Sequence, residues 1–264
     1  MKFKIDHDLH MHSRFSLCSG SDSHTGERML QYAKDFGFHT LVVTDHFWDE
    51  KAGEAPIDYR GLNFAHISQI KPLPKAEGIR FLFGCETELD YNFKLGLSKE
   101  LYDEFDFIVI PTTHMHLKSA IKDEDFNNTE KRIELWTQRF EAVLNMDLPF
   151  HKVGIAHLAC TGVARDRAEY IKVLDSIPEE DMRRLFTKAK ELGAGIEING
   201  SDVEFADSEA DTVLRMFRIA KECGCKFYLG SDLHSTKRPY ESFIPLYERA
   251  IDLLGLTEED KFVI

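Results

Sequence analysis

Histidine, aspartate and glutamate side chains recur along this chain, each time directly after a short apolar segment. The first segment ends in the alternating residues Asp8, His10 and His12. Residues spaced i, i+2 lie on one face of an extended strand, so both imidazoles should point the same way. The later segments end in the same residue types, at Asp45 and His46, Glu86 and Glu88, His114 and His116, His157, Glu197 and Asn199, and Asp232 and His234.

Imidazole and carboxylate groups without paired cysteines are the typical ligands of zinc, manganese or iron at catalytic sites. A single histidine at the end of a strand is more often a hydrogen-bonded structural residue than a ligand. Many ionisable groups at successive strand ends are a different case, because burying them together is costly unless cations neutralise them. The pattern therefore predicts a site that binds divalent metal ions.

The apolar segments ahead of these residues predict parallel strands, because they are continuously apolar and alternate with helical patterns. They cover residues 3–9, 40–44, 80–84, 107–110, 153–156, 195–198 and 226–230. Seven strand–helix units without a glycine-rich phosphate loop favour a closed or nearly closed β/α barrel over a dinucleotide-binding sheet. The carboxyl ends of barrel strands meet at one face, where the ionisable groups would converge.

Two connecting segments carry their own helix signals. Ser176 and Glu179 have the spacing of a capping box with a proline inside the first turn, and apolar residues follow at helical spacing up to Gly193. Residues 207–222 repeat the apolar pattern and are followed by Gly224. We expect a helix in each segment, ending before its glycine.

Composition limits the classes of function. The chain has 264 residues, 43% of them hydrophobic, which fits a single barrel domain over residues 1–264. The net charge of -13 repels phosphate backbones and argues against a nucleic-acid partner. A small phosphorylated substrate stays compatible with this charge, because bound metal ions reverse the potential locally.

The five cysteines, with no secretory segment, are typical of a reducing cytoplasm and free thiols. Cys223 and Cys225 form a close pair away from the other candidate ligands, and we interpret the pair as incidental. No apolar stretch is long enough to span a bilayer, so we expect a soluble cytoplasmic protein without a membrane partner. The sequence leaves the oligomeric state open.

In chain order, these motifs resemble the PHP (polymerase and histidinol phosphatase) family. The resemblance runs from residue 8 to residue 234 through Asp8-Leu-His10-Met-His12, Thr44-Asp45-His46, Gly84-Cys-Glu86-Thr-Glu88, His114 after Pro111-Thr-Thr, Ile155-Ala-His157, Glu197-Ile-Asn199 and Gly230-Ser-Asp232-Leu-His234. It implies an α/β fold, a distorted (β/α)7 barrel of the TIM type, with the metal site at the carboxyl ends of the strands. It also implies two or three divalent metal ions (Zn, Mn or Fe).

The resemblance implies nine metal ligands. It places His10, His12, Glu86 and Asp232 on one ion, Glu86, His114 and His157 on a second, and Cys18, His46 and His234 on a third. Cys18 stands where the family usually supplies another ligand, often histidine. A thiolate is a competent zinc ligand, and a serine-like spacer role is the alternative for this residue.

The implied activity is hydrolysis of a small phosphomonoester by a hydroxide that bridges the metal ions. The catalytic residues are then those that hold the ions, with His10, His12, Glu86 and Asp232 at the centre. Arg14 is a candidate for binding the substrate phosphate, with an ordinary surface arginine as the alternative. Three further side chains should orient the imidazoles or the backbone, namely Asp8, Asp45 and Asn199.

Several interpretations remain open at this point. Glu88 and His116 could orient ligands or face the substrate, and residues 48–62 and 117–131 should shape the pocket. Asp45 stands where histidinol-phosphate phosphatases usually have glutamate, which leaves the substrate open among histidinol phosphate, sugar phosphates and other small monoesters.

Two other classes of protein compete with this interpretation. An amidohydrolase-type barrel also opens with two alternating histidines, but it normally needs a bridging lysine after its fourth strand. Here that segment ends Ile110-Pro-Thr-Thr-His114 without a lysine, and the candidate bridging carboxylate, Glu86, comes earlier. A non-catalytic, structural PHP domain is the other alternative, and this chain retains nearly every ligand of the family.

Overall fold

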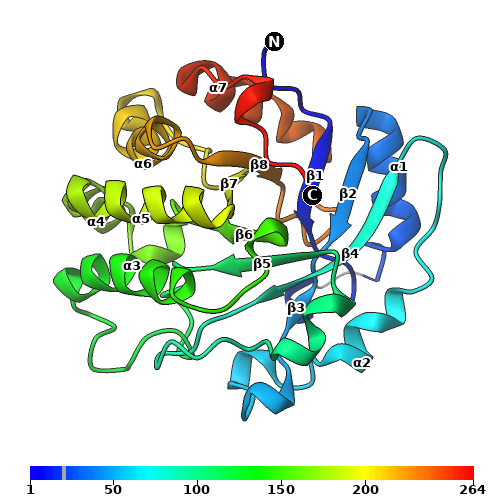
Figure 1. Ribbon diagram of the computed structural model, residues 1–264, viewed down its shortest axis with the longest axis horizontal. Helices are drawn as coiled ribbons and strands as arrows, with labels where there is room; N and C mark the ends of the chain where they lie inside the picture. The colour runs from blue at the N-terminus through cyan, green and yellow to red at the C-terminus, as the bar shows by residue number, and fades with distance from the viewer. Residues whose placement is uncertain (20–21) are drawn as a thin grey trace.

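The strands of the protein run parallel and form a nearly closed barrel with helices around it (Figure 1). The computed structural model describes residues 1–19 and 22–264. Neighbouring strands follow the order β1 (His7–Met11), β2 (Thr40–Val43), β4 (Arg80–Thr87), β5 (Phe107–Pro111), β6 (Val153–Ala156), β7 (Gly195–Asn199) and β8 (Lys226–Gly230). The predicted α/β barrel is therefore confirmed.

The short strand β3 (His46–Phe47) continues β2 after an interruption. Thr40 of β2 pairs with Arg80, and His46 of β3 pairs with Glu86, so both strands keep the same register against β4. The described strands thus occupy seven positions around the barrel. The interruption places Asp45 between the two parts of this strand, next to the predicted site.

Residues beyond the end of β8 join the last strand to the first. The amide of Asp232 donates to the His10 carbonyl at 2.8 Å, and the amide of His12 donates to the Leu233 carbonyl at 3.1 Å. The carboxylate of Asp8 accepts from the amides of His10 and Ser231, at 3.1 Å each. The seam of the barrel is therefore closed by the segments that carry the candidate ligands.

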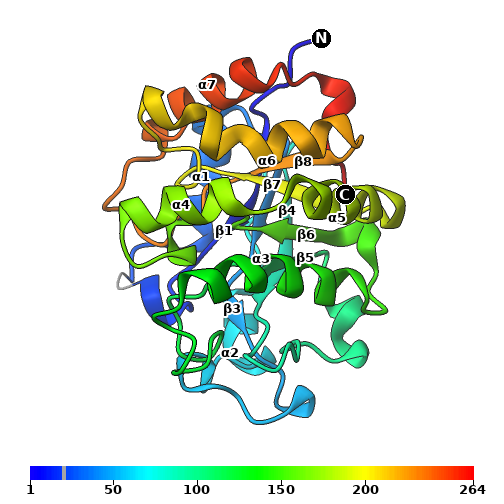
Figure 2. The same ribbon diagram turned by 90° about the vertical axis from the view of Figure 1, so that its left-hand side faces the viewer.

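Helices cover the outside of the barrel. They are α1 (Gly26–Phe36), α2 (Phe64–Ile67), α3 (Thr129–Leu144), α4 (Arg167–Ser176), α5 (Glu179–Leu192), α6 (Ala210–Glu222) and α7 (Ile244–Leu254). In Figure 2, α3, α4, α5 and α6 face the viewer and shield β5 to β8. No helix among the described residues is long and apolar enough to cross a membrane.

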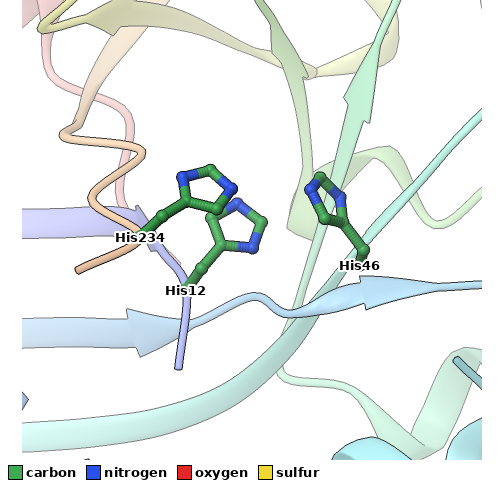
Figure 3. A group of neighbouring side chains, drawn as sticks. All are labelled: His12, His46 and His234. Carbon is green, nitrogen blue, oxygen red and sulfur yellow. The ribbon is translucent and has the colours of Figure 1, made fainter. Parts of the chain in front are cut away.

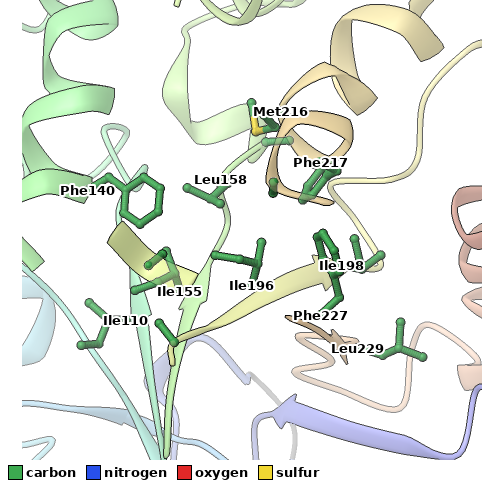
Figure 4. Packing of buried hydrophobic residues seen from close by; sticks show 14 of the residues in the cluster. Ile110, Phe140, Ile155, Leu158, Ile196, Ile198, Met216, Phe217, Phe227 and Leu229 are labelled. Carbon is green, nitrogen blue, oxygen red and sulfur yellow. The ribbon is translucent and has the colours of Figure 1, made fainter. Parts of the chain in front are cut away.

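Two apolar layers hold the strands, because their side chains alternate between the two faces. Outward-facing residues such as Ile155 and Ile196 pack against Phe140 of α3 and Phe217 of α6 (Figure 4). A smaller cluster fills the barrel interior, formed by Leu9, Val42, Phe107, Val109, Ala156, Tyr228 and Phe262. The candidate ligands lie above this interior cluster, at the carboxyl ends of the strands.

Several predicted boundaries differ from the structure. β1 begins at His7 rather than residue 3, because the amide of Phe3 bonds to the Leu256 carbonyl outside the sheet. β4 continues to Thr87, so Glu86 lies within the strand instead of following it. The bounds of β6 and β8 are as predicted.

The predicted capping box at the start of α5 is wrong. Ser176 is the last residue of α4, and Pro178 occupies the N-cap of α5 without a side-chain hydrogen bond. Acidic residues fill the first turn of α5 instead, and their charge interacts favourably with the helix dipole. The predicted end of this helix at Gly193 is confirmed, since that residue has a φ of 82°.

Candidate metal centre

Side chains converge at the carboxyl end of the barrel, where segments that follow several of the strands border a cavity of about 510 Å³. Its lining residues are Leu17, Cys18, His46, Ile57, Asp58, Tyr59, Leu62, His114, His116, Leu117, His157, Cys160, Asp232 and His234. The two predicted inserts, residues 48–62 and 117–131, supply part of this wall, including Tyr59 and Leu117.

The carboxylate of Glu86 lies at the centre of the group. Its Oε2 is 2.7 Å from His46 Nδ1 and 3.3 Å from His12 Nε2. Its Oε1 is 3.5 Å from both His10 Nε2 and His157 Nε2. The Glu86 side chain is fully buried, so these imidazoles are its main polar surroundings.

Asp232 approaches the same imidazoles from the opposite side of the barrel. Its Oδ1 is 3.0 Å from His12 Nε2 and 3.5 Å from His10 Nε2, and its Oδ2 is 3.5 Å from His157 Nε2. Ligand atoms of His10, His12, Glu86 and Asp232 all lie within 4.8 Å of one another. This is the first group of ligands that the sequence predicts.

The close polar atoms of this group are largely without hydrogen bonds. Both carboxylate oxygens of Glu86, both ring nitrogens of His157 and Oδ1 of Asp232 are buried and lack a hydrogen-bond partner among the described residues. Leaving so many polar atoms unsatisfied would be costly. Divalent cations between them would satisfy most of these atoms at once, so the residues fit a metal centre.

The imidazoles of His12, His46 and His234 form a further group of neighbouring candidate ligands. The rings of His12 and His234 are stacked with centroids 4.0 Å apart, and the His46 ring lies 4.4 Å from that of His12 (Figure 3). Cys18 lines the same cavity as His46 and His234; burial raises the pKa of its thiol, but these two imidazoles outweigh that effect and lower it to about 7. The structure thus places Cys18 beside the two histidines with which the sequence groups it.

Most of the histidines are held in a fixed tautomer by acceptor atoms that are not themselves candidate ligand atoms. The Nδ1–H of His10 donates to Glu197 at 2.6 Å, and that of His114 donates to Glu88 at 2.9 Å. The Nδ1–H of His234 donates to a backbone carbonyl, that of Asp232, at 2.7 Å. With Nδ1 as the donor, Nε2 is the nitrogen through which each neutral imidazole could bind a metal ion.

His12 is oriented through a short chain of hydrogen bonds. Its Nδ1–H donates to the Ser16 hydroxyl at 2.9 Å, and that hydroxyl donates to Asp45 at 2.8 Å. Asp45 also accepts from the amide of Ser13 at 2.7 Å. The structure therefore places Asp45 where the sequence predicts, but its contact with His12 passes through a serine that the sequence analysis did not single out.

Burial and charge act in opposite directions on the ionisable groups. Burial disfavours the imidazolium of His10, but the neighbouring carboxylates of Glu197 and Glu86 outweigh it and raise its pKa to about 10. Burial disfavours ionisation of Glu86 as well, yet the cationic imidazoles hold its pKa well below the usual range. For His12, burial and the charges of His234 and His46 lower the pKa to about 3. The carboxylates thus require positive charge beside them, which divalent cations could supply.

Backbone strain helps to direct two of the candidate ligands. His157 and Asp232, which follow β6 and β8, have φ values of 59° and 52°. Non-glycine residues adopt this left-handed region at a cost, and they do so mainly at functional sites. The strained backbone turns both side chains toward Glu86 and each other.

The remaining predicted residues lie in different places. Asp8 bonds to the backbone of both strands at the seam, and Asn199 accepts from the amide of Ser201 at 2.9 Å in the turn after β7. Arg14 is exposed, and its guanidinium lies over the ring of Phe15 at 5.1 Å, so it is not brought into the cavity wall. Its role in binding substrate stays a prediction.

The sequence analysis did not assign the supporting roles of several residues. It gave the orienting role in β7 to Asn199, whereas Glu197, which it named beside Asn199, makes the contact with His10. Arg139 of α3 donates to Glu88 at 2.7 Å and so holds in place the carboxylate that orients His114. Asp202 is buried 3.7 Å from His157 Nδ1. Of these three residues, Glu197 carried a recognisable sequence signal, because it lies near the end of a predicted strand.

A substitution at Gly230 tests whether the hydrogen bond between Glu197 and His10 is needed for metal binding. A β-carbon at Gly230 would contact the Glu197 carboxylate and lie 2.7 Å from the His10 β-carbon. We expect Gly230→Ala to lower metal affinity about 10- to 100-fold, since it displaces the acceptor that orients His10. Titration against a chromogenic chelator would measure this.

A matched glycine variant separates metal affinity from packing. Gly154→Ala adds a β-carbon against the Tyr228 and Phe107 rings in the barrel interior, 2.6 Å from each. This variant should lose about 1–3 kcal/mol of stability and keep its metal affinity. Unchanged metal affinity in Gly230→Ala would show that the contact between Glu197 and His10 is not needed.

Comparisons with known proteins point to one family. The sequence profile of the PHP domain matches residues 8–201. A protein from Caldicellulosiruptor saccharolyticus described as a probable phosphatase is 22% identical over 231 residues, covering 87% of this chain and 80% of that protein. The crystal structure of histidinol phosphate phosphatase from Lactococcus lactis, complexed with zinc, L-histidinol and phosphate, superposes with a TM-score of 0.59. The two chains share 18% sequence identity. The superposition covers 98% of this chain and 99% of the Lactococcus lactis chain, which establishes a common fold.

Proposed function

The chain belongs to the PHP domain family, and from this premise we propose that it is a metal-dependent phosphatase that hydrolyses a small phosphomonoester. One observation carries the proposal. The buried oxygens of Glu86 and Asp232 and the nitrogens of His10, His12 and His157 converge while most of them lack hydrogen-bond partners. The names of the two relatives agree with this activity.

Nine side chains would hold the metal ions. They are His10, His12, Cys18, His46, Glu86, His114, His157, Asp232 and His234. Two or three divalent ions bound there would polarise the phosphoryl oxygens and lower the pKa of water enough for attack at neutral pH. Glu197, Glu88 and Ser16 would fix the orientation of the imidazoles through their hydrogen bonds. The apolar cluster in the barrel interior would keep water out of the side of the site that faces the barrel.

The lining of the cavity supports metal dependence. None of the described residues around it is a lysine or an arginine, so the charge of a bound phosphate would have to be balanced by cations. The same lining offers no lysine that could be carbamylated, which disfavours the amidohydrolase alternative. Histidinol phosphate is a candidate substrate, with the Asp58 carboxylate at the rim as a partner for an amino group.

Metal removal tests the proposal directly. We expect protein purified without chelator to contain two or three equivalents of zinc, manganese or iron and to hydrolyse members of a phosphomonoester panel that includes histidinol phosphate. Chelation should abolish this activity and lower the melting temperature by on the order of 10 °C, because ions that bind only the folded chain stabilise it. Elemental analysis, a phosphate-release assay and calorimetry measure the three effects.

Restoration provides the control for this experiment. Adding zinc or manganese to the chelated protein should recover both activity and melting temperature, whereas magnesium should not recover the melting temperature, because it disfavours imidazole ligands. Less than one equivalent of metal after supplementation, together with no hydrolysis of any ester, would refute the proposed function.

A further inference from the structure

One cysteine that the nine-ligand set omits faces the metal centre. Cys160 lies in the turn after β6, three residues beyond His157, and its side chain lines the cavity. Its Sγ and one ring nitrogen each of His114 and His157 lie within 4.8 Å of one another. We propose that Cys160 is an additional ligand of the ion held by His114 and His157. The inference rests on the proposed function, because it presupposes a metal ion at this site.

The surroundings of His157 provide a second, independent observation. This imidazole is 3% exposed, and neither of its nitrogens has a hydrogen-bond partner among the described residues. Its Nδ1 lies 3.7 Å from Asp202, beyond hydrogen-bonding distance, and its Nε2 lies 3.5 Å from Glu86. An unsatisfied buried imidazole beside a thiol points to a cation shared between them.

The backbone of the turn that carries Cys160 fixes the position of its sulfur atom. The amide of Gly162 donates to Cys160 Sγ at 3.2 Å, and a hydrogen bond of this kind favours a thiolate over a thiol. Gly162 itself has no room for a side chain, since a β-carbon there would collide with His116 and lie 3.3 Å from the sulfur. Glycine thus lets His116 and Cys160 pack side by side at the cavity wall.

Ligand chemistry agrees with the same assignment. A divalent ion held by His114 and His157 would bind the thiolate and release the thiol proton, as ions do at other cysteine ligands. A sulfur ligand also makes the site softer and favours zinc or cobalt over manganese.

Cobalt substitution gives a direct readout of sulfur coordination. Cobalt(II) takes the same ligands as zinc, its visible bands report that it is bound, and a near-ultraviolet charge-transfer band appears only when a thiolate coordinates it. Cys18 could produce the same band, so the experiment compares Cys18→Ser with Cys18→Ser/Cys160→Ser. Cys223→Ser is the matched control, because that thiol contacts the Arg183 carbonyl on the outer helices.

The outcomes separate this inference from the proposed function. We expect Cys18→Ser and the control to keep a sulfur–cobalt band and the double variant to lose it while its visible bands persist. Visible bands without a sulfur band in Cys18→Ser would overturn the role of Cys160 and leave the proposed function standing. Failure of the wild-type protein to bind cobalt or any other divalent ion would overturn both.

Alkylation provides a test that needs no variant. Cys160 is half-buried and borders the cavity as well as an adjoining pocket of about 490 Å³, so iodoacetamide can reach it. Mass spectrometry of the wild-type protein should show Cys160 modified about tenfold or more slowly with zinc than after chelation, because coordination blocks the nucleophilic sulfur. The modification rate of Cys223 should not change with metal. Equal rates for Cys160 in both states would contradict the assignment.

Discussion

Replacing Glu86 with glutamine should lower kcat/KM for the best phosphomonoester by about three orders of magnitude or more, the scale of losing a central charged group from a catalytic site. Glutamine keeps the size of the side chain and removes its charge. The Glu86 carboxylate lies within 3.5 Å of His10, His12, His46 and His157, so its charge acts on all four imidazoles. Steady-state kinetics and elemental analysis of the same sample measure the loss of activity and of metal.

The fold should survive this substitution. The Glu86 carboxylate has no hydrogen-bond partner within the described part of the chain, and its burial is costly without neighbouring cations. The chelated variant should therefore melt no lower than the chelated wild-type protein, while added zinc should raise its melting temperature far less.

Glu258→Gln serves as the matched control, because that carboxylate accepts from the Lys4 amide at 2.7 Å, near the amino terminus and away from the cavity. It should retain full activity. A Glu86→Gln variant that keeps its metal and its activity would show that this carboxylate is not a bridging ligand.

Replacing Arg139 with methionine should destabilise the protein by about 3–5 kcal/mol, the range found when one partner of a buried ion pair is removed. The Arg139 side chain is fully buried. It donates to Glu88 at 2.7 Å and to the backbone carbonyls of Thr112, Leu89, Ala120 and Asp90. Methionine would leave the Glu88 carboxylate without its counter-ion. Chemical denaturation of the chelated protein measures this change in the free energy of unfolding.

Arg132→Met is a well-matched control for that experiment. Arg132 is also a fully buried arginine of α3, but it donates only to carbonyls, those of Phe126, Met115 and Val163. Its loss leaves no unpaired carboxylate, so it should be less destabilising. Adding Glu88→Gln should restore part of the stability of Arg139→Met, because the uncompensated charge is then removed. Equal destabilisation by the two arginine variants would contradict the importance of the ion pair.

Arg139 should also affect the metal centre through Glu88. The Glu88 carboxylate accepts from the Nδ1–H of His114, and Arg139 fixes its other oxygen. Folded Arg139→Met protein should therefore bind metal about 10- to 100-fold more weakly, as is usual when the partner of a ligand histidine is lost. Arg132→Met should leave metal affinity unchanged.

Much of the barrel could be predicted because its strands give a strong local signal. β6 is a continuous apolar run buried on both faces, β8 is one from Phe227 onward, and both strands have the predicted bounds. The signal fails where polar residues extend a strand, as in β4, which continues through Glu86 and Thr87. Glu86 is buried among imidazoles rather than by apolar packing, so hydrophobic periodicity does not reveal this part of the strand. The capping box at Ser176 failed for another reason, because the pattern did not show that the preceding helix runs up to that residue.

By itself, the sequence determined which residue types meet at the carboxyl end of the barrel. Parallel strands all end at the same face, so the order of the strands and the spacing within each one were sufficient to bring His10, Glu86 and Asp232 together. Only the tertiary structure decided which acceptor holds each imidazole and which thiols face the cavity. His10 and its acceptor Glu197 are 187 residues apart in the chain, and Arg139 reaches Glu88 from a helix that packs behind the strands. Such contacts depend on how distant segments pack side by side, which no local pattern of residues encodes.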